Sequence, residues 1–382
     1  MKKTLIITWD FPQQVGGIAT YVKQFADSMP NDKVVVYAWK LKGREKECKE
    51  FDAKSPYKVI RKKPLWPRLF WPRWSRLLWQ IFWIVRKEKI EAIHIHQVLP
   101  VGYIGLAMKK LFKIPYLVFS HGTDIREATR TKWKTAMARK VVFGAEQIIV
   151  NSEFLKSRWL SALSELQNKI TVVYPCPNDG FFVALSNEEI ARLKSQLALD
   201  GKKVMLTVSR LTEGKGFPHL LRLMPELLKS VPNLVWLVIG DGPKKQELFE
   251  TTRKNNLQNV VRFIGASSHD EVKKYFYTAD LFVLLTHPDE GREEGMGLVF
   301  LEASACGLPS VAGKSGGVGE AVYDGQTGVI VDIYRGDKSV ISAIVGLLKD
   351  PVKLKAMGEQ AKLRAQYDFK WEAQLAKLKE WL

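Results

Sequence analysis

The chain has 382 residues, of which 46% are hydrophobic and 26% are charged, and its formal net charge is +19. This length and composition predict a globular protein of two domains and exclude a disordered or fibrous chain. The three cysteines, Cys48, Cys176 and Cys306, show no paired spacing, which indicates a reducing compartment and disfavours a disulfide scaffold or a zinc site.

Apolar runs typical of buried strands alternate with helical patterns along almost the whole chain. In the N-terminal half the predicted strands are Thr4–Thr8, Lys33–Ala38, Ala92–His96, Pro115–His121, Gln147–Asn151 and Thr171–Tyr174. In the C-terminal half they are Lys203–Ser209, Leu234–Gly240, Val260–Gly265, Leu281–Leu285, Pro309–Gly313 and Gly328–Val331. Such alternation predicts parallel sheets of the α/β class. The first run is too short for a signal peptide, and no run reaches the roughly 18 residues of a membrane span.

The stretch Tyr174–Gly180 is rich in proline and glycine and marks the best domain boundary. We predict two Rossmann-like domains, residues 1–176 and 180–366. The amphipathic segment 367–382 is expected to pack back on the first domain.

Two loops of the N-terminal half carry residues suited to ligand contact. The segment Phe11–Ile18 joins the first strand to a helix and contains Gly16 and Gly17. Glycines at a helix start let a phosphate or sugar approach the backbone closely, although a plain turn also explains them. A lone histidine is usually structural, but His121 lies at the carboxyl end of a strand, where ligands bind in α/β sheets. A functional role is therefore favoured for His121.

No metal site is predicted. His94 and His96 lie within a strand, are expected to be partly buried, and have no partner at metal-ligand spacing. The sequence contains no Asp-x-Asp pair, so a metal-held diphosphate is not supported.

In the C-terminal half, three strand ends are candidates for the same sheet edge. After the first of them, Arg210 and Lys215 bring two cations and a Gly-Lys-Gly turn to a helix start, which suits a pyrophosphate; a solvated loop is the alternative. Gly242 lies in a tight Gly-Asp-Gly-Pro turn after the next strand, and Ile264 lies near the end of the strand after that. Turn chemistry alone explains Gly242, so these two are weaker candidates for donor binding.

Residues 292–320 combine a glycine-rich turn, an apolar helix and a short strand. Glu294 precedes the helix and Glu302 lies inside it. A helix N-terminus after a glycine turn is a ready anion site, and its candidate residues here are Met296, Gly297 and Leu298. The two carboxylates are free to face sugar hydroxyls, so the stretch predicts part of a nucleotide-sugar site.

Two other nucleotide motifs are excluded. Gly313-Lys314-Ser315 resembles the end of a P-loop, but the position that must be glycine is Leu308. No G-x-G-x-x-G follows the first strand, so nicotinamide or flavin binding loses its main support. Lys314 is predicted to be an ordinary loop residue.

The stretch from Arg61 to Lys89 is rich in both tryptophan and cations and contains one acid, Glu88. On a helical wheel the residues expected to face the core are Trp74, Leu77, Leu78, Ile81, Phe82 and Val85. Trp79 and Trp83 fall on the opposite face. Tryptophan beside arginine on an outward face suits an anionic membrane interface, and the candidates are Arg68, Arg73, Arg76, Trp79 and Trp83. Packing within the first domain is the alternative, and nucleic-acid binding is disfavoured because no nucleic-acid motif accompanies the charge.

Together these motifs resemble those of the family 4 retaining glycosyltransferases, whose GT-B fold has two Rossmann-like parallel-sheet domains facing across a cleft. The resemblance covers most of the chain, is strongest from Val204 to Val331, and looks closest to the phosphatidylinositol mannosyltransferase type. It is carried by the Glu-x7-Glu spacing of Glu294 and Glu302, the pair Arg210 and Lys215, and the segments Gly16-Gly17 and His121–Asp124.

The resemblance implies a role for each group. Arg210 and Lys215 would neutralise the leaving diphosphate, helped by the backbone N–H groups of residues 296–298 and by close approach at Gly17. On the sugar side, Glu294 would contact the donor sugar and Glu302 the ribose. His121 would lie near the anomeric centre.

We therefore predict a retaining, metal-independent glycosyltransferase without a cofactor. It would move a hexose from GDP-mannose or a UDP-sugar to a lipid-linked, glycolipid or polysaccharide acceptor in cell-envelope glycan synthesis. We expect a cytoplasmic protein, peripheral on the inner face of the membrane, that binds an anionic membrane surface and no nucleic acid. Alternatives are a GT-B sugar-nucleotide epimerase and a transferase with a soluble acceptor; a non-catalytic nucleic-acid-binding protein is the least favoured.

Overall fold

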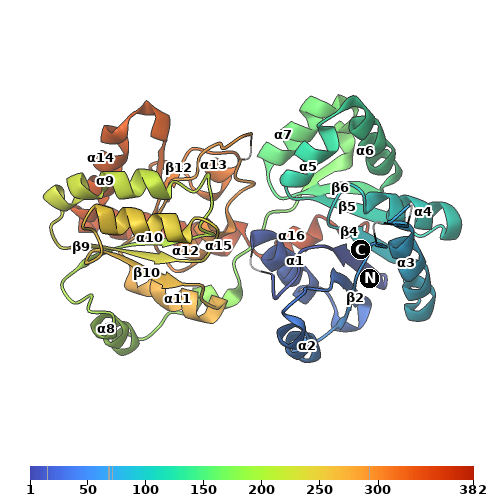
Figure 1. Cartoon of the computed structure of the whole chain (residues 1–382), viewed down its shortest axis with the longest axis horizontal. Helices are drawn as coiled ribbons and strands as arrows, with labels where there is room; N and C mark the ends of the chain where they lie inside the picture. Colours follow the sequence, from blue (N-terminus) through green and yellow to red (C-terminus); the bar gives the residue numbers. More distant parts are fainter. Residues whose placement is uncertain (15, 68, 71, 292) are drawn as a thin grey trace. The chain divides into compact units, whose positions relative to one another are not determined.

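The computed structural model describes residues 1–14, 16–67, 69–70, 72–291 and 293–382. The chain forms two compact units, each built on a parallel sheet with helices packed against it (Figure 1). Unit 1 comprises Met1–Pro175 and Trp371–Leu382, and unit 2 comprises Cys176–Lys370. The two sheets confirm the predicted α/β class with two Rossmann-like halves.

In the described part of unit 1 the sheet has seven strands, in the order β3-β2-β1-β4-β5-β6-β7. They are β1 (Thr4–Thr8), β2 (Val34–Trp39), β3 (Lys58–Lys62), β4 (Ala92–Ile95), β5 (Tyr116–Ser120), β6 (Gln147–Val150) and β7 (Ile170–Val172). The paired strands are parallel, so their carboxyl ends share one edge of the sheet. The ends of β1, β4 and β5 are neighbours on that edge.

Helices cover both faces of this sheet because its central strands are apolar on both sides. In β1, Leu5 and Ile7 pack on the face covered by α3 and α4, whereas Ile6 packs on the other face against α1. Successive residues of a strand point to opposite faces, and burying each such side chain contributes roughly 1.5–3 kcal/mol. The helices of unit 1 are α1 (Gly17–Asp27), α2 (Glu45–Lys54), α3 (Ser75–Glu88), α4 (Gly102–Phe112), α5 (Thr123–Thr129), α6 (Lys132–Gly144), α7 (Glu153–Ala162) and α16 (Trp371–Ala376).

The strand β3 is one that the sequence analysis missed. Its sequence, Lys-Val-Ile-Arg-Lys, has only two apolar residues. It lies at the end of the strand order and pairs with β2, and edge strands commonly carry charged side chains. Because charged residues flank Val59 and Ile60, β3 lacks the longer apolar run by which buried strands are recognised in a sequence.

The C-terminal segment returns to unit 1. The long helix α15 (Pro351–Asp368) belongs to unit 2, and the part that packs on unit 1 begins at Trp371, so residues 367–370 do not belong to it. The indole of Trp371 lies edge-on to Tyr21 of α1, with ring centroids 5.5 Å apart. Figure 1 shows this segment in red beside α1 in blue.

Among the residues that the structure describes, unit 2 contributes a six-stranded sheet in the order β10-β9-β8-β11-β12-β13. Its strands are β8 (Lys203–Val208), β9 (Leu234–Ile239), β10 (Val261–Gly265), β11 (Leu281–Leu284), β12 (Ser310–Gly313) and β13 (Gly328–Val331). Its remaining helices are α8 (Asn187–Gln196), α9 (Phe217–Ser230), α10 (Lys245–Lys254), α11 (His269–Thr278), α12 (Leu298–Ala305), α13 (Val318–Ala321) and α14 (Asp337–Leu348). These strands agree with the predicted ones to within one residue at each end.

Candidate active site

The strand order of unit 2 reverses direction between β8 and β11. From β8 the chain adds β9 and β10 on one side, and β11, β12 and β13 follow on the other. The carboxyl edge at such a reversal of strand order is where open α/β sheets bind ligands. The loop that leaves β8 carries Arg210 and Lys215, and the loop that leaves β11 leads to Glu294.

Two glycines bring these loops into close contact. Gly216 has φ +74°, and a Cβ at this position would lie 2.3 Å from the carbonyl oxygen of Leu285. The carbonyl oxygen of Gly214 accepts a hydrogen bond of 3.1 Å from the backbone N–H of His287. Only glycine takes such a backbone without strain, so the Gly-Lys-Gly sequence fixes Lys215 beside the end of β11.

Lys215 and Glu294 form an ion pair at this edge. The ammonium nitrogen Nζ lies 2.5 Å from Oε2 of the carboxylate, and both side chains are half-buried. The backbone N–H of Glu294 donates to Oγ of Ser315 at 3.2 Å, and its carbonyl accepts from Gly317 at 3.0 Å. Glu294 is thus held by the loop after β12 as well as by Lys215, while Arg210 is exposed at the end of β8.

The helix α12 begins where the sequence predicts. Gly297 is its N-cap, with φ +87°, and a Cβ there would lie 2.6 Å from the ring of Phe300. Met296 is buried and Leu298 is half-buried. The turn therefore needs glycine for local packing as well as for any close approach of a ligand.

Glu302 lies one turn inside α12 and is 5% exposed. Burial raises the pKa of this carboxyl to about 8. A carboxyl at this depth is a costly feature, and functional sites are where such perturbed groups gather.

The two weaker donor candidates lie farther along the same sheet. A Cβ on Gly242 would lie 2.4 Å from the carbonyl oxygen of Leu211, so this glycine serves the contact between the loops after β8 and β9. Ile264 is half-buried in β10, the edge strand.

In unit 1, Gly16 lies in the loop after β1 and His121 follows β5. These two strands are separated in the sheet by β4 alone. Gly16 caps α1 and Gly17 is its first residue. A Cβ on either would meet nothing within 4 Å. Unlike Gly216, Gly242 and Gly297 of unit 2, these two are not required by packing within the described residues.

His121 forms a pair with His96. Nε2 of His121 lies 3.1 Å from Nδ1 of His96, and Tyr21 of α1 lies edge-on to the His121 ring, with centroids 5.1 Å apart. Burial lowers the pKa of His121 to about 4, so its ring is neutral near pH 7. The expectation that His94 and His96 are partly buried is wrong: they are 0% and 4% exposed, because α1 covers this face of the sheet.

Asp124 holds the turn that follows β5. Its Oδ1 accepts hydrogen bonds from the backbone N–H groups of His121 and Gly122, each at 3.0 Å, and from Oγ of Ser120 at 3.1 Å. These hydrogen bonds from the backbone that precedes it explain why an aspartate three residues after His121 suits this turn. Asp124 therefore orients the backbone that carries His121.

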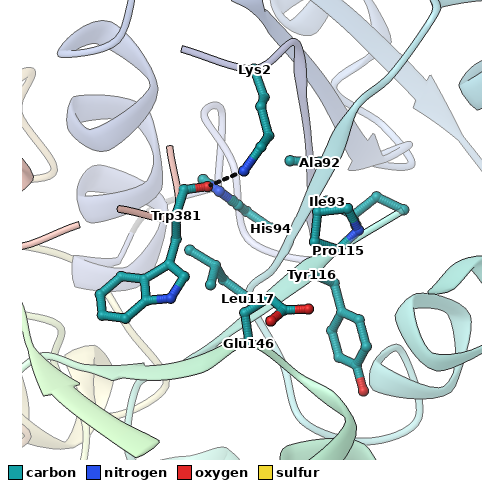
Figure 2. Close-up of a pocket in the computed structure, with 9 residues that line it drawn as sticks. All are labelled: Lys2, Ala92, Ile93, His94, Pro115, Tyr116, Leu117, Glu146 and Trp381. Atoms are coloured by element: carbon teal, nitrogen blue, oxygen red, sulfur yellow. Dashed lines mark hydrogen bonds between the residues drawn. The ribbon is translucent and has the colours of Figure 1, made fainter. Parts of the chain in front are cut away.

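A small hollow lies at the opposite edge of the unit 1 sheet, where β4 and β5 begin. Figure 2 shows Lys2 and Trp381 beside it, with Nζ of Lys2 donating to the Trp381 carbonyl at 3.5 Å. Its volume of about 20 Å³ suits about one water molecule. It is too small for a sugar and distant along the strands from His121.

The basic, tryptophan-rich stretch forms α3 and the loop before it. Leu77, Ile81 and Val85 are buried as predicted, and Trp79 and Trp83 are 60% and 54% exposed. Trp74 is the exception: it is exposed although the wheel placed it toward the core, because it precedes the first residue of α3.

Two arginines of this stretch contact Trp66 in the loop before α3. Arg76 lies over the ring of Trp66 at 5.0 Å, and Nε of Arg73 donates to the Trp66 carbonyl at 3.0 Å. Arg68 lies outside the described residues. Beside α3, Phe112 of α4 contacts Phe82 at 5.5 Å between centroids.

Two site residues were not predicted. Ser315 binds the Glu294 backbone, yet the sequence analysis weighed it only as part of a rejected P-loop. His96 contacts His121, but it was read as a strand residue. His96 follows the last residue of β4, which neighbours β5 in the sheet, and this strand order leaves no local signal in the sequence.

Comparison with known proteins decides the family. The family model described as "Glycosyl transferases group 1" matches residues 189–364, and the model "Glycosyltransferase Family 4" matches residues 15–178. A protein of Mycolicibacterium smegmatis named GDP-mannose-dependent alpha-(1-6)-phosphatidylinositol monomannoside mannosyltransferase is 30% identical, over 99% of this chain and 97% of its own length. The chain belongs to the group 1, family 4 glycosyltransferases.

Other relatives agree with this assignment. A GDP-mannose-dependent monoacylated alpha-(1-6)-phosphatidylinositol monomannoside mannosyltransferase of Corynebacterium glutamicum is 26% identical, over 97% of this chain and 95% of its own length. The crystal structure of Anabaena HepE in complex with UDP has a TM-score of 0.81 at 20% identity, and the match covers 99% of this chain and 98% of that one. The predicted GT-B fold and glycosyltransferase class of this family member are thereby confirmed.

No group of three or more His, Cys, Asp or Glu side chains among the described residues is placed to hold a metal ion. None of the helices described for this glycosyltransferase is both long and apolar enough to cross a membrane.

Proposed function

We propose that this glycosyltransferase moves a hexose, with retention of anomeric configuration and without a metal ion, from a nucleotide-diphosphate sugar to a membrane-associated acceptor. The observation that carries the proposal is the Lys215–Glu294 pair at the point where the strand order of unit 2 reverses. In a nucleotide sugar, one bond joins the sugar to the diphosphate. A site that binds both groups at this bond needs a cation for the diphosphate beside a carboxylate for the sugar.

On the leaving-group side, Arg210 and Lys215 are the groups that neutralise the diphosphate. Negative charge grows on this group as the glycosidic bond breaks, and the N-terminus of α12 at Gly297 adds backbone donors. Each well-placed donor in comparable sites contributes about 2.7–4 kcal/mol to the transition state. These groups supply the charge that a metal ion supplies in other transferases.

On the sugar side, Glu294 binds hydroxyls of the transferred hexose and Glu302 binds the ribose. His121 acts near the anomeric centre, and Gly17 lets the diphosphate approach the start of α1. A front-face transfer, in which the leaving diphosphate takes the acceptor proton, accounts for retention without a second carboxylate.

GDP-mannose is the donor we favour, and UDP-sugars are the second candidates. The relatives with the highest identity quoted above carry GDP-mannose in their names, whereas the fold neighbour HepE was solved with UDP. The names of the two relatives also support a phosphatidylinositol-type glycolipid as acceptor. We propose that the enzyme acts peripherally on the inner face of the cell membrane, with α3 facing the anionic lipid surface. We propose that it does not bind nucleic acid.

A thermal-shift panel of GDP-mannose, UDP-glucose, UDP-galactose and UDP-N-acetylglucosamine, each with and without EDTA, tests the donor and the metal. A ligand at 100 times its Kd stabilises the fold by about 2.7 kcal/mol, and we expect GDP-mannose to do so at the lowest concentration with no effect of EDTA. Anomeric analysis of the transferred sugar by NMR then tests retention. A failure of all donors to stabilise the protein, or loss of the shift in EDTA, contradicts the proposal.

The main alternative is tested by the same reagents. A sugar-nucleotide epimerase converts the donor in the absence of an acceptor. We expect donor alone to yield no epimer, and transfer only when glycolipid is added. A soluble acceptor would be used equally well without any lipid.

A further inference from the structure

Arg61 is the first residue of the basic stretch of the sequence, yet the fold turns its side chain inward. It lies near the end of β3 and its side chain is 7% exposed, whereas Lys58 and Lys62 of the same strand are exposed. Charged residues of an edge strand usually face the solvent. Burying a guanidinium is costly unless partners satisfy it, so the contacts of Arg61 indicate its role.

The register of the sheet places Arg61 beside the loop that leaves β1. Arg61 is in register with Ala38 of β2, and Ala38 is in register with Thr8, the last residue of β1. Because the three strands are parallel, Arg61 is level with the point where β1 ends and the loop to Gly16 and Gly17 begins. Arg61 can therefore contact this loop at the carboxyl edge of the sheet.

The guanidinium of Arg61 joins α2 to the loop. Nε lies 2.9 Å and Nη2 3.0 Å from the two carboxylate oxygens of Asp52 on α2, a bidentate geometry that lysine cannot reproduce. Nη2 also donates to the carbonyl oxygen of Pro12, and the guanidinium lies over the ring of Phe11, 5.5 Å from its centroid. Nη1 is enclosed and has no hydrogen-bond partner among the described residues. Arg61 therefore acts through the loop and not directly on a ligand.

A second arginine binds the next peptide group of the loop. Nη1 of Arg44, the residue before α2, donates to the carbonyl oxygen of Gln13 at 2.8 Å. Within the described part of the chain, residues 11–14 make one backbone–backbone hydrogen bond, from the N–H of Gln14 to the carbonyl of Phe11 at 3.0 Å. The loop is thus held mainly by side chains at the two ends of α2, and the buried one is Arg61.

We propose that Arg61 is a positioning residue of the transfer reaction, which holds the loop between β1 and α1 so that Gly16 and Gly17 offer a fixed helix start to the diphosphate. The Cβ positions of Gly16 and Gly17 meet nothing within 4 Å, so packing at these positions does not fix the loop. A group misplaced by about 1 Å can lower a rate about 10²-fold. The hold on the loop stands on the contacts of Arg61, whereas its effect on transfer rests on the proposed function.

The test removes the buried ion pair without leaving a charge unpaired. Arg61→Met combined with Asp52→Leu exchanges both partners for apolar side chains, a change that folded proteins often tolerate, and it removes the donor to Pro12. The matched control is Lys58→Met combined with Glu88→Leu, because this ion pair of 2.7 Å starts from the same strand and is made with α3 instead of the loop. Arg61→Lys is the second variant, since it keeps a charge beside Asp52 but cannot bind both carboxylate oxygens and Pro12.

Amide hydrogen exchange of the full chain, followed by mass spectrometry, measures the loop without any substrate. We expect exchange in segment 11–20 to be about tenfold faster in both Arg61 variants, because a charge-assisted hydrogen bond is lost, and unchanged in the control. If the double variant does not fold, Arg61→Lys decides. Unaltered exchange in the Arg61 variants, or equal acceleration in the control, overturns the inference.

Initial rates, normalised to the folded fraction of each variant, provide the second readout. We expect kcat to fall about tenfold in both Arg61 variants, with the KM for the donor little changed, because the other proposed donor-binding groups, such as Lys215 and Glu294, belong to unit 2. An unchanged kcat in a variant whose loop exchanges faster overturns the positioning role. If the unaltered protein transfers no sugar, the proposed function fails, and hydrogen exchange alone decides whether Arg61 holds the loop.

Discussion

The ammonium of Lys215 lies 2.5 Å from the carboxylate of Glu294, although 79 positions separate the two in the chain. The loops after β8 and β11 bring them together, and glycines on both sides of Lys215 set the approach. A cation and a carboxylate joined in this way match the two halves of a nucleotide sugar. Under the proposed function, substitutions of Lys215 and of Glu294 should therefore affect diphosphate binding and sugar binding separately.

Replacing Lys215 by alanine removes the cation that we propose faces the diphosphate. We expect kcat to fall about 10²–10³-fold, the usual cost of removing one group that stabilises developing negative charge. Initial rates with a saturating donor measure this. Lys229→Ala removes a cation of α9 that pairs with Glu226 at the surface and is the control, with rates expected to stay unchanged. A Lys215→Ala rate close to that of the control would contradict the role assigned to Lys215.

The glycines of the two units are expected to respond differently to alanine. Gly17 has open space around its Cβ position and lies at the start of α1, so Gly17→Ala should leave stability unchanged or raise it by up to about 1 kcal/mol. Transfer should nevertheless fall, because the new methyl group would obstruct the diphosphate that we propose approaches this helix start. Gly242→Ala should instead lower the melting temperature, since its Cβ meets the backbone of Leu211. Equal rates for Gly17→Ala and the unaltered enzyme would assign Gly17 to a plain turn.

The sequence predicted the two sheets, nearly all strands and the loops that carry Arg210, Lys215 and Glu294, because buried parallel strands and glycine turns leave local patterns. It did not predict β3, whose charges suit a sheet edge, nor the exposure of Trp74, which depends on where α3 begins. The His96–His121 contact was missed for a different reason. It depends on β4 and β5 being neighbours in the sheet, and that order is a property of the fold as a whole.

Glu302 is expected to make the fold less stable as the pH rises. Its pKa is raised from 4.5 to about 8, so between these pH values the unfolded chain loses a proton that the folded chain keeps, and the free energy of unfolding falls. Glu302→Gln removes the titration. We expect the variant to match the unaltered protein at pH 5 and to exceed its stability at pH 8 by on the order of 1–3 kcal/mol. Thermal unfolding across this range measures the difference, and parallel pH profiles would refute the assignment.

His94 is expected to have the opposite effect in acid. Burial lowers its pKa from 6.5 to about 3, so below pH 6.5 the unfolded chain binds a proton that the folded chain refuses, and stability is lost as the pH falls. His94→Leu should therefore stabilise the protein more at pH 4.5 than at pH 7, by on the order of 1–2 kcal/mol. Urea unfolding at the two pH values provides the measurement. His96 and His121 remain in the variant and should keep part of the acid sensitivity.

The exposed indoles of α3 provide the test of membrane binding. We expect the protein to float with vesicles that contain phosphatidylglycerol and to stay behind with phosphatidylcholine alone, because cations of the chain are attracted to anionic lipid. Trp79→Ala combined with Trp83→Ala should weaken flotation at least about tenfold, since it removes apolar area that inserts between headgroups. Trp133→Ala is the matched control, because Trp133 is 69% exposed on α6 of the same unit.

Salt separates the two contributions to this binding. The Debye length shortens from about 10 Å at 0.1 M to about 3 Å at 1 M, so high salt should release the double variant from the vesicles more readily than the unaltered protein, which keeps its apolar contact. If the double variant and the unaltered protein float alike at every salt concentration, the tryptophans of α3 do not contact the membrane. Binding would then depend on charge alone, and the acceptor would have to be reached from another surface of unit 1.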